Sequence, residues 1–232
     1  QQFKFSESAI IVKIYTEELG LQSYMIKGSR SRKSEQKAAY FEPLSLLEMV
    51  VYHKENKNLQ SIKELKSAYP WRNIPFHIEK QSILLFLNEI LYKTLREESP
   101  NKSLFEFIFN SLSWFDLEEN NYLNFHLFFL LQLSRYLGFL PKTGFADNNN
   151  SYFDLQEGFF STIKPLHPYY IEGKISADLR FLVNQNIETL KTFSPDTIRR
   201  LKLLDALVIY FQIHLPEMGE VKSLKILRNI FH

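Results

Sequence analysis

Residues 8–28 read SAIIVKIYTEELGLQSYMIKG, and this stretch decides how the N-terminal part of the chain folds. Residues 9–15 and 21–27 are rich in β-branched and aromatic side chains, which favour strands. The short connection between these two runs ends in Gly20 and predicts a hairpin. The chain therefore begins with a pair of antiparallel strands.

Two further apolar runs, residues 44–53 and 59–65, predict two more strands. In the first run the apolar side chains fall in both phases of a strand: Leu44, Leu46, Val50 and Tyr52 in one phase, and Leu47, Met49 and Val51 in the other. Apolar residues in both phases predict burial on both faces, as in a small closed or half-closed barrel.

Residues 69–75 read YPWRNIP, and the two prolines interrupt the strand pattern. We predict a domain boundary there. Residues 1–72 then form the strand domain and residues 73–232 a helical domain with an irregular insert at 142–174. Within the insert, residues 153–155 suggest a short edge element.

Apolar spacing predicts helices over residues 76–96 and 122–137, and a last amphipathic helix over 222–231. Two more helices are predicted to start at Ser99 and Ser194, because each serine can cap a helix and is followed by proline. The helix over 122–137 is apolar almost all round, so we expect it at the buried centre of the helical domain.

The composition limits the classes of function. Lys and Arg number 28 against 26 Asp and Glu, so an anion-binding surface must come from local clustering and not from the net charge of +2. The absence of cysteine excludes disulfides, thiolate nucleophiles and cysteine-bound metals, and is compatible with a cytoplasmic location. No run approaches the roughly 18 to 20 apolar residues of a membrane span.

Motifs of catalysis are absent from the sequence. There is no Gly-rich phosphate loop, no His-Glu-x-x-His helix and no Gly-x-Ser-x-Gly elbow. The six histidines are scattered singly, without a second ligand at helical spacing, so we expect no metal site. The sequence therefore predicts no enzyme and no cofactor.

One charged cluster exceeds the background. Residues 27–37 read KGSRSRKSEQK and carry one acid and five cations: Lys27, Arg30, Arg32, Lys33 and Lys37. On composition alone, a solvated loop and a nucleic-acid contact are equally good interpretations. The position of the cluster between two strands of a small barrel favours contact with single strands.

The strands beside this cluster carry three more candidate DNA-binding residues. Lys13 adds a cation, and Tyr15 and Tyr24 are candidate platforms for stacked bases. Packing inside the barrel is the alternative interpretation for both tyrosines.

These residues together resemble the RecO recombination-mediator family. Residues 8–28 lead into the basic loop and then into the strand that begins Pro43-Leu44, as in the N-terminal signature of that family. Leu137-Gly138-Phe139 resembles the step that ends a hydrophobic helix in its members. The resemblance covers nearly the whole chain and is looser after residue 142. It implies an α+β fold, with an OB-fold β-barrel followed by an α-helical domain.

The resemblance also implies a function. RecO-like proteins act in DNA repair: they bind single- and double-stranded DNA, anneal complementary strands, and work with RecR to load RecA onto DNA coated by single-stranded DNA-binding protein. The C-terminal tail of the latter binds the helical domain, and we predict a pocket for it made by His126, Phe129, Leu133 and Arg135. A helical protein-interaction adaptor with no direct DNA contact is the alternative.

The sequence departs from the family in two places. Many members hold a four-cysteine zinc site in the insert, whereas this chain has no cysteine, so we predict that Phe153, Phe159, Phe160 and Tyr169 hold the insert by packing. Members also begin with one more strand, here missing or reduced to residues 1–5, so the barrel is expected to be incomplete.

Overall fold

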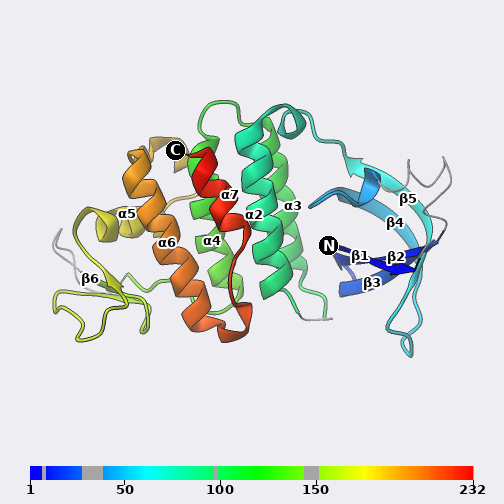
Figure 1. Cartoon of the computed structure of the whole chain (residues 1–232), viewed down its shortest axis with the longest axis horizontal. Helices are drawn as coiled ribbons and strands as arrows, with labels where there is room; N and C mark the ends of the chain where they lie inside the picture. The colour runs from blue at the N-terminus through cyan, green and yellow to red at the C-terminus, as the bar shows by residue number, and fades with distance from the viewer. Residues whose placement is uncertain (7–8, 28–38, 97–98, 144–151, 232) are drawn as a thin grey trace. The chain divides into compact units, whose positions relative to one another are not determined.

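The computed structural model of the chain in Figure 1 describes residues 1–6, 9–27, 39–96, 99–143 and 152–231. The chain divides into two compact units. The first comprises residues 1–77 and 84–117, and the second comprises residues 78–83 and 118–232. In the described ranges, no helix is long and apolar enough to cross a membrane.

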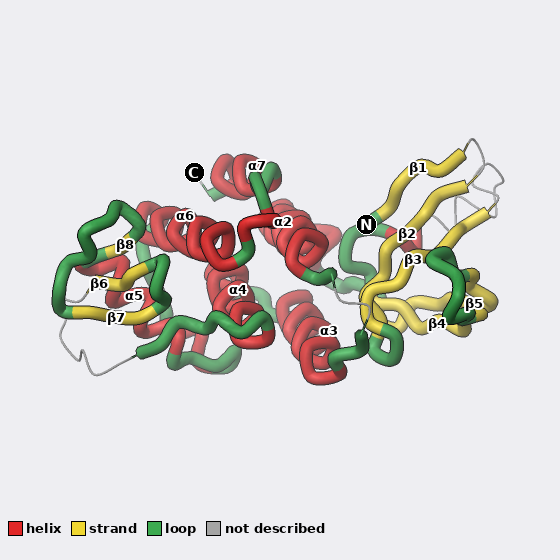
Figure 2. The backbone as a smooth tube through the Cα atoms, turned by 90° about the horizontal axis from the view of Figure 1, so that it is seen from below, coloured by secondary structure: helices red, strands yellow, loops and turns green. Residues whose placement is uncertain are grey.

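Strands form two sheets in the first unit, coloured yellow in Figure 2. The first sheet has the order β1-β2-β3, and the second pairs β4 with β5. The strands are β1 (Gln2–Ser6), β2 (Ala9–Thr16), β3 (Gly20–Lys27), β4 (Leu46–Tyr52) and β5 (Ser61–Tyr69). The predicted N-terminal hairpin is confirmed, and a five-residue strand, β1, precedes it. Among the residues that the structure describes, the two sheets do not close into a barrel, which agrees with an incomplete OB-fold.

The core between these sheets is small. Val12, Tyr24 and Phe41 are buried, and apolar side chains of both sheets pack around them. Backbone hydrogen bonds join the sheets, since the Met25 amide donates to the Gln60 carbonyl at 3.0 Å and the Gln60 amide donates to the Ser23 carbonyl at 2.9 Å. The expected burial of both faces of residues 44–53 is wrong, because one face of β4 points to solvent.

Two helices belong wholly or partly to the first unit. They are α2 (Ile78–Thr94), whose first turns lie in the second unit, and α3 (Lys102–Leu117). The prediction that α3 begins at a Ser99 cap is wrong. The Asn101 side chain accepts the Leu104 amide at 3.0 Å, so asparagine caps the helix two residues later.

The second unit is built around α4 (Phe125–Tyr136), which packs against α5 (Gly173–Val183) and α6 (Thr197–His214). Nine residues of α4 are buried, which confirms the predicted central helix. The last helix is α7 (Ser223–Ile230), also as predicted. The α6 cap is Asp196 and not Ser194, because Asp196 Oδ1 accepts the Arg199 amide at 2.8 Å.

The insert carries a small sheet of order β7-β6-β8, formed by β6 (Tyr152–Asp154), β7 (Phe159–Ser161) and β8 (Tyr170–Ile171). The predicted edge element is therefore the central strand. Phe153 and Phe160 are buried with ring centroids 4.8 Å apart, as the packing hypothesis requires. Phe159 and Tyr169 are exposed, so that half of the predicted packing set is wrong.

Five short 3-10 helices complete the described structure. They are η1 (Ala39–Phe41), η2 (Ile74–Phe76), η3 (Tyr122–Asn124), η4 (Thr189–Thr192) and η5 (Pro216–Met218).

Candidate nucleic-acid interface

The β2–β3 hairpin positions the start of the basic loop. Its turn is closed by the Thr16 hydroxyl, which accepts the Leu19 amide at 3.1 Å and donates to the Gly20 carbonyl at 2.9 Å. Gly20 has a φ of 64°, a value that favours glycine. The strands then pair without a shift in register up to Ala9 and Lys27. The loop therefore leaves the sheet from the end opposite the turn.

Of the five predicted cations of the loop, Lys27 is the last residue of β3. Arg30, Arg32, Lys33 and Lys37 lie outside the described residues. Their contact with DNA stays a prediction.

The segment after β5 is fixed by a buried carboxylate at the end of α3. Asp116 accepts the backbone amides of Arg72, Asn73 and Ile74 at 2.8 to 2.9 Å, and the Tyr69 hydroxyl at 3.1 Å. Burial alone would raise the pKa of Asp116, but these hydrogen bonds outweigh it and lower the pKa below the usual aspartate value. A charged Asp116 therefore holds this segment to α3 within the first unit.

The two tyrosines predicted to stack on bases occupy different environments. Tyr24 is completely buried in the core between the sheets, and burial raises its pKa. In this structure its ring offers no face to a nucleotide, which supports the packing interpretation for Tyr24. Tyr15 is half-buried, and its ring centroid lies 6.4 Å from that of Phe105 on α3. Packing therefore covers part of Tyr15 as well.

Lys13 lies beside a cavity in the first unit. Its ammonium is 5.9 Å from the centroid of the Tyr92 ring on α2. The cavity has a volume of about 150 Å³ and is mainly apolar, with Ile14, Leu44 and Phe105 among its lining residues. The environment of Lys13 is thus a helix surface, and its role in DNA binding stays a prediction.

The pocket predicted on α4 is not open in this structure. His126, Phe129 and Leu133 have no exposed surface, whereas Arg135 is exposed. Burial, with a smaller contribution from the charge of Arg200, lowers the pKa of His126 to about 3. In this structure these three side chains supply the core of their unit, and a partner contact made by them stays a prediction.

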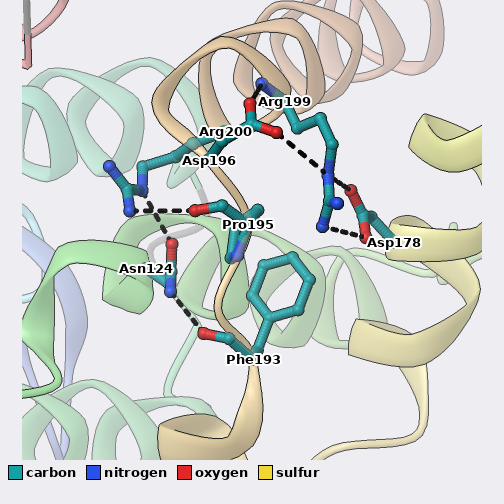
Figure 3. A network of polar contacts seen from close by, with 7 residues as sticks. All are labelled: Asn124, Asp178, Phe193, Pro195, Asp196, Arg199 and Arg200. Carbon is teal, nitrogen blue, oxygen red and sulfur yellow. Dashed lines mark hydrogen bonds and ion pairs between the residues drawn. The ribbon is translucent and has the colours of Figure 1, made fainter.

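Arginines at the start of α6 are held by other protein groups, as Figure 3 shows. Arg199 donates two hydrogen bonds to the Asp178 carboxylate, at 2.8 and 3.0 Å. Arg200 donates to the Asn124 side chain at 2.8 Å, and Asn124 in turn donates to the Phe193 carbonyl at 2.8 Å. These interactions join α5, α6 and the segment before α4, so the arginines have a structural role in the helical unit.

Sequence reasoning missed an exposed aromatic residue on the second sheet. Tyr52, at the end of β4, is 58% exposed. It lies in phase with Glu48 and Val50, which are also exposed. The charged Glu48 in that phase was the signal that this face points to solvent.

In the part of the chain that the structure describes, no group of three or more His, Asp and Glu side chains is placed to hold a metal ion.

Comparison with known proteins identifies the family. Residues 1–71 match the family model described as Recombination protein O N terminal, and residues 75–225 match the model described as Recombination protein O C terminal. The chain belongs to the RecO family. The family predicted from the sequence is thereby confirmed.

RecO-family relatives align with nearly the whole chain. The protein named DNA repair protein RecO from Phocaeicola vulgatus is 36% identical over 227 residues, which are 98% of this chain and 94% of the relative. Proteins of the same name from Flavobacterium johnsoniae and Bacteroides fragilis are 37% and 36% identical over 234 and 229 residues, with the same coverage.

Proposed function

We propose that this RecO-family chain acts in DNA repair as a recombination mediator. It binds single- and double-stranded DNA, promotes annealing of complementary strands, and helps RecR to load RecA. It acts by binding and positioning, without making or breaking covalent bonds. The observation that carries the proposal is the match of residues 1–71 and 75–225 to the two RecO family models.

The basic loop supplies the physical mechanism of DNA binding. Cations that neutralise phosphates release condensed counterions, and this release drives association with any DNA sequence. The loop follows β3, and its five cations lie within eleven residues. Neutralised strands repel one another less, so annealing accelerates when two strands are held on the same protein.

The helical unit is the proposed site for the acidic, apolar-ended tail of single-stranded DNA-binding protein. Of the four residues predicted for this contact, the exposed Arg135 is the one able to meet a carboxylate. Titration of a labelled tail peptide should give weaker binding for Arg135→Ala than for the unchanged chain. Equal affinities would remove Arg135 from this contact.

Fluorescence anisotropy with a labelled oligonucleotide across a salt series tests DNA binding. The affinity should fall steeply with salt, and the slope of log K against log salt should shrink by about 0.7 to 0.9 for each phosphate contact that is lost. The test variant replaces Arg30, Arg32 and Lys33 by alanine. The matched control replaces three exposed cations of the second unit, Lys174, Lys191 and Lys202, by alanine and should keep the slope.

A second measurement tests annealing. Complementary strands carrying a donor and an acceptor dye should pair faster with the unchanged chain than with the basic-loop variant. If the chain binds no DNA at low salt, the repair mechanism is wrong and the adaptor alternative takes its place. If it binds DNA but does not accelerate pairing, the annealing step is wrong.

A further inference from the structure

The hairpin that joins β4 and β5 carries a surface that the basic loop does not account for. Figure 1 shows this hairpin projecting beyond the two strands. On β4, Leu47, Met49 and Val51 pack against the core between the sheets, while Val50 and Tyr52 of the opposite phase are 48% and 58% exposed. Val50 and the aromatic ring of Tyr52 thus face solvent at the base of the hairpin.

The hairpin is held in a defined conformation by Gln60, whose side chain is almost completely buried. The Gln60 side-chain oxygen accepts the Lys54 amide at 2.9 Å, and its nitrogen donates to the carbonyls of Lys54 and Lys57 at 2.9 and 2.6 Å. The Gln60 backbone is itself bonded to β3. The loop is therefore fixed before any ligand binds, which reduces the entropy lost on binding.

Charges on the hairpin are unevenly paired. On the strands, Lys66 pairs with Glu48 at 2.9 Å and Lys63 pairs with Glu64 at 3.4 Å. At the tip, Lys54 and Lys57 are exposed and form no ion pair with any described residue. The uncompensated cations thus lie within five residues of the exposed Tyr52 ring.

We propose that Tyr52, Lys54 and Lys57 form a contact for an unpaired nucleotide, and that this contact gives the chain a preference for single-stranded DNA. The Tyr52 ring stacks on one base, and the two lysines neutralise the phosphates beside it. A paired base keeps its faces stacked on its neighbours, so a duplex cannot use the ring. The inference rests on the proposed DNA binding and adds strand selectivity to it.

Nucleic acid fits this surface better than a protein partner does. The other side chains of the tip are polar, with His53, Glu55, Asn56 and Asn58 all exposed. A protein interface is built around a larger apolar centre from which charged residues are depleted. An exposed ring close in sequence to exposed lysines, on a backbone that Gln60 holds, instead suits sequence-tolerant stacking.

The decisive experiment compares Tyr52→Ala with Tyr52→Phe on an oligothymidylate and on a duplex of the same length. Tyr52→Ala should bind the single strand about 10-fold more weakly and leave duplex binding unchanged, whereas Tyr52→Phe should keep the affinity for both. Phe5→Ala is the matched control, since Phe5 is 57% exposed in the same unit and should not affect either ligand.

The roles of Lys54 and Lys57 are tested separately, by the salt dependence of binding. Lys54→Gln and Lys57→Gln should each reduce the salt slope for the single strand by about 0.7, whereas Tyr52→Ala should leave this slope unchanged. Photo-cross-linking with 5-iodo-2′-deoxyuridine in the single strand should attach the peptide that contains Tyr52. This labelling should fall in Gln60→Ala, because the hairpin then loses its fixed conformation.

The outcomes separate this inference from the proposed function. If the unchanged chain binds both DNAs and the basic-loop variant loses slope, but Tyr52→Ala binds as tightly as the unchanged chain, the hairpin contact is wrong and DNA binding stands. Equal losses in Phe5→Ala and Tyr52→Ala would also overturn it. If the unchanged chain binds neither DNA at low salt, both proposals fail.

Discussion

The sheets of the first unit and helix α4 of the second use their apolar residues in opposite ways. Between the sheets, three residues are buried at the centre, two on strands and Phe41 on η1, and one face of β4 remains open to solvent. In α4, nine of twelve residues are buried. A side chain that fills a core is not available to a ligand, so candidate binding residues lie where few side chains are buried.

The basic residues of the two regions also differ in whether other protein groups bind them. Arg199 and Arg200 of α6 are bound by Asp178 and Asn124 and stabilise the packing of helices. Lys54 and Lys57 of the β4–β5 hairpin have no described ion-pair partner. A cation can neutralise a phosphate at little cost when it gives up no other partner, so exposed basic residues predict binding better than basic residues in general.

Truncation of the α4 core should have the largest effect. Phe129 is completely buried, so Phe129→Ala should lower the free energy of unfolding by about 3 to 5 kcal/mol. Urea unfolding followed by circular dichroism measures this loss. Ile209→Ala on α6, where the side chain is 38% exposed, is the control and should cost far less. Similar losses in the two variants would show that α4 is not the centre of its unit.

Loss of the Asp116 charge in the first unit should have the next largest effect on stability. Asp116→Asn removes the charge that three backbone amides and the Tyr69 hydroxyl stabilise, and should cost about 2 to 3 kcal/mol. Both tryptophans, Trp71 and Trp114, belong to this unit, so their fluorescence reports its unfolding. Glu106→Gln on the exposed face of α3 is the control and should change stability by less than about 0.5 kcal/mol.

Acid should lower the stability of the two units over different pH ranges. His126 has a folded pKa of about 3, far below its unfolded value of about 6.5, because burial opposes its charge. A group with a depressed folded pKa stabilises the protein above the unfolded pKa, and this stability is lost as the pH falls. The loss should be about 1.4 kcal/mol for each pH unit below 6.5.

The contribution of Asp116 to stability is also lost as the pH falls, but at a lower pH than that of His126. Its folded pKa is lowered from an unfolded value of about 3.9, so its contribution is present above that value and is lost as the pH falls through the folded pKa. Between pH 6.5 and 5, the His126 effect should operate and the Asp116 effect should not. His126→Leu should therefore flatten the pH dependence in this range, and an unchanged slope in that variant would assign it to another group.

The sequence predicted the order of elements well, because apolar periodicity and turn residues are local signals. The β2–β3 hairpin, the central helix α4 and the last helix α7 all form where the pattern places them. Helix starts were less accurate. Asn101 and Asp196 cap α3 and α6, where serine followed by proline had suggested Ser99 and Ser194, because several polar residues near each start compete for the cap.

The candidate site was harder to predict because exposure depends on how the sheets pack. Tyr24 and Tyr52 both lie on strands and look alike in the sequence, yet one is buried and the other is 58% exposed. The Gln60 contacts that fix the hairpin also require knowledge of the fold, since they depend on β5 lying beside β3. Charge clustering alone pointed to the basic loop and gave no indication of the hairpin.

The smallest effect should come from Tyr24, and it should have the opposite sign. Its buried hydroxyl has no hydrogen-bond partner among the described residues, so Tyr24→Phe should raise the free energy of unfolding by about 1 kcal/mol. Tyr69→Phe is the matched control and should be destabilising, because the Tyr69 hydroxyl donates to Asp116. Tryptophan fluorescence during urea unfolding measures both changes.

The same variant sharpens the assignment of the stacking residue. Because Tyr24 lies in the core and Tyr52 faces solvent, Tyr24→Phe should bind an oligothymidylate as tightly as the unchanged chain. Weaker binding by Tyr24→Phe, with stability unchanged or raised, would mean that the sheets separate to admit a base. In that case the thin core would itself be part of the binding surface, and the contrast with α4 would be one of rigidity as well as exposure.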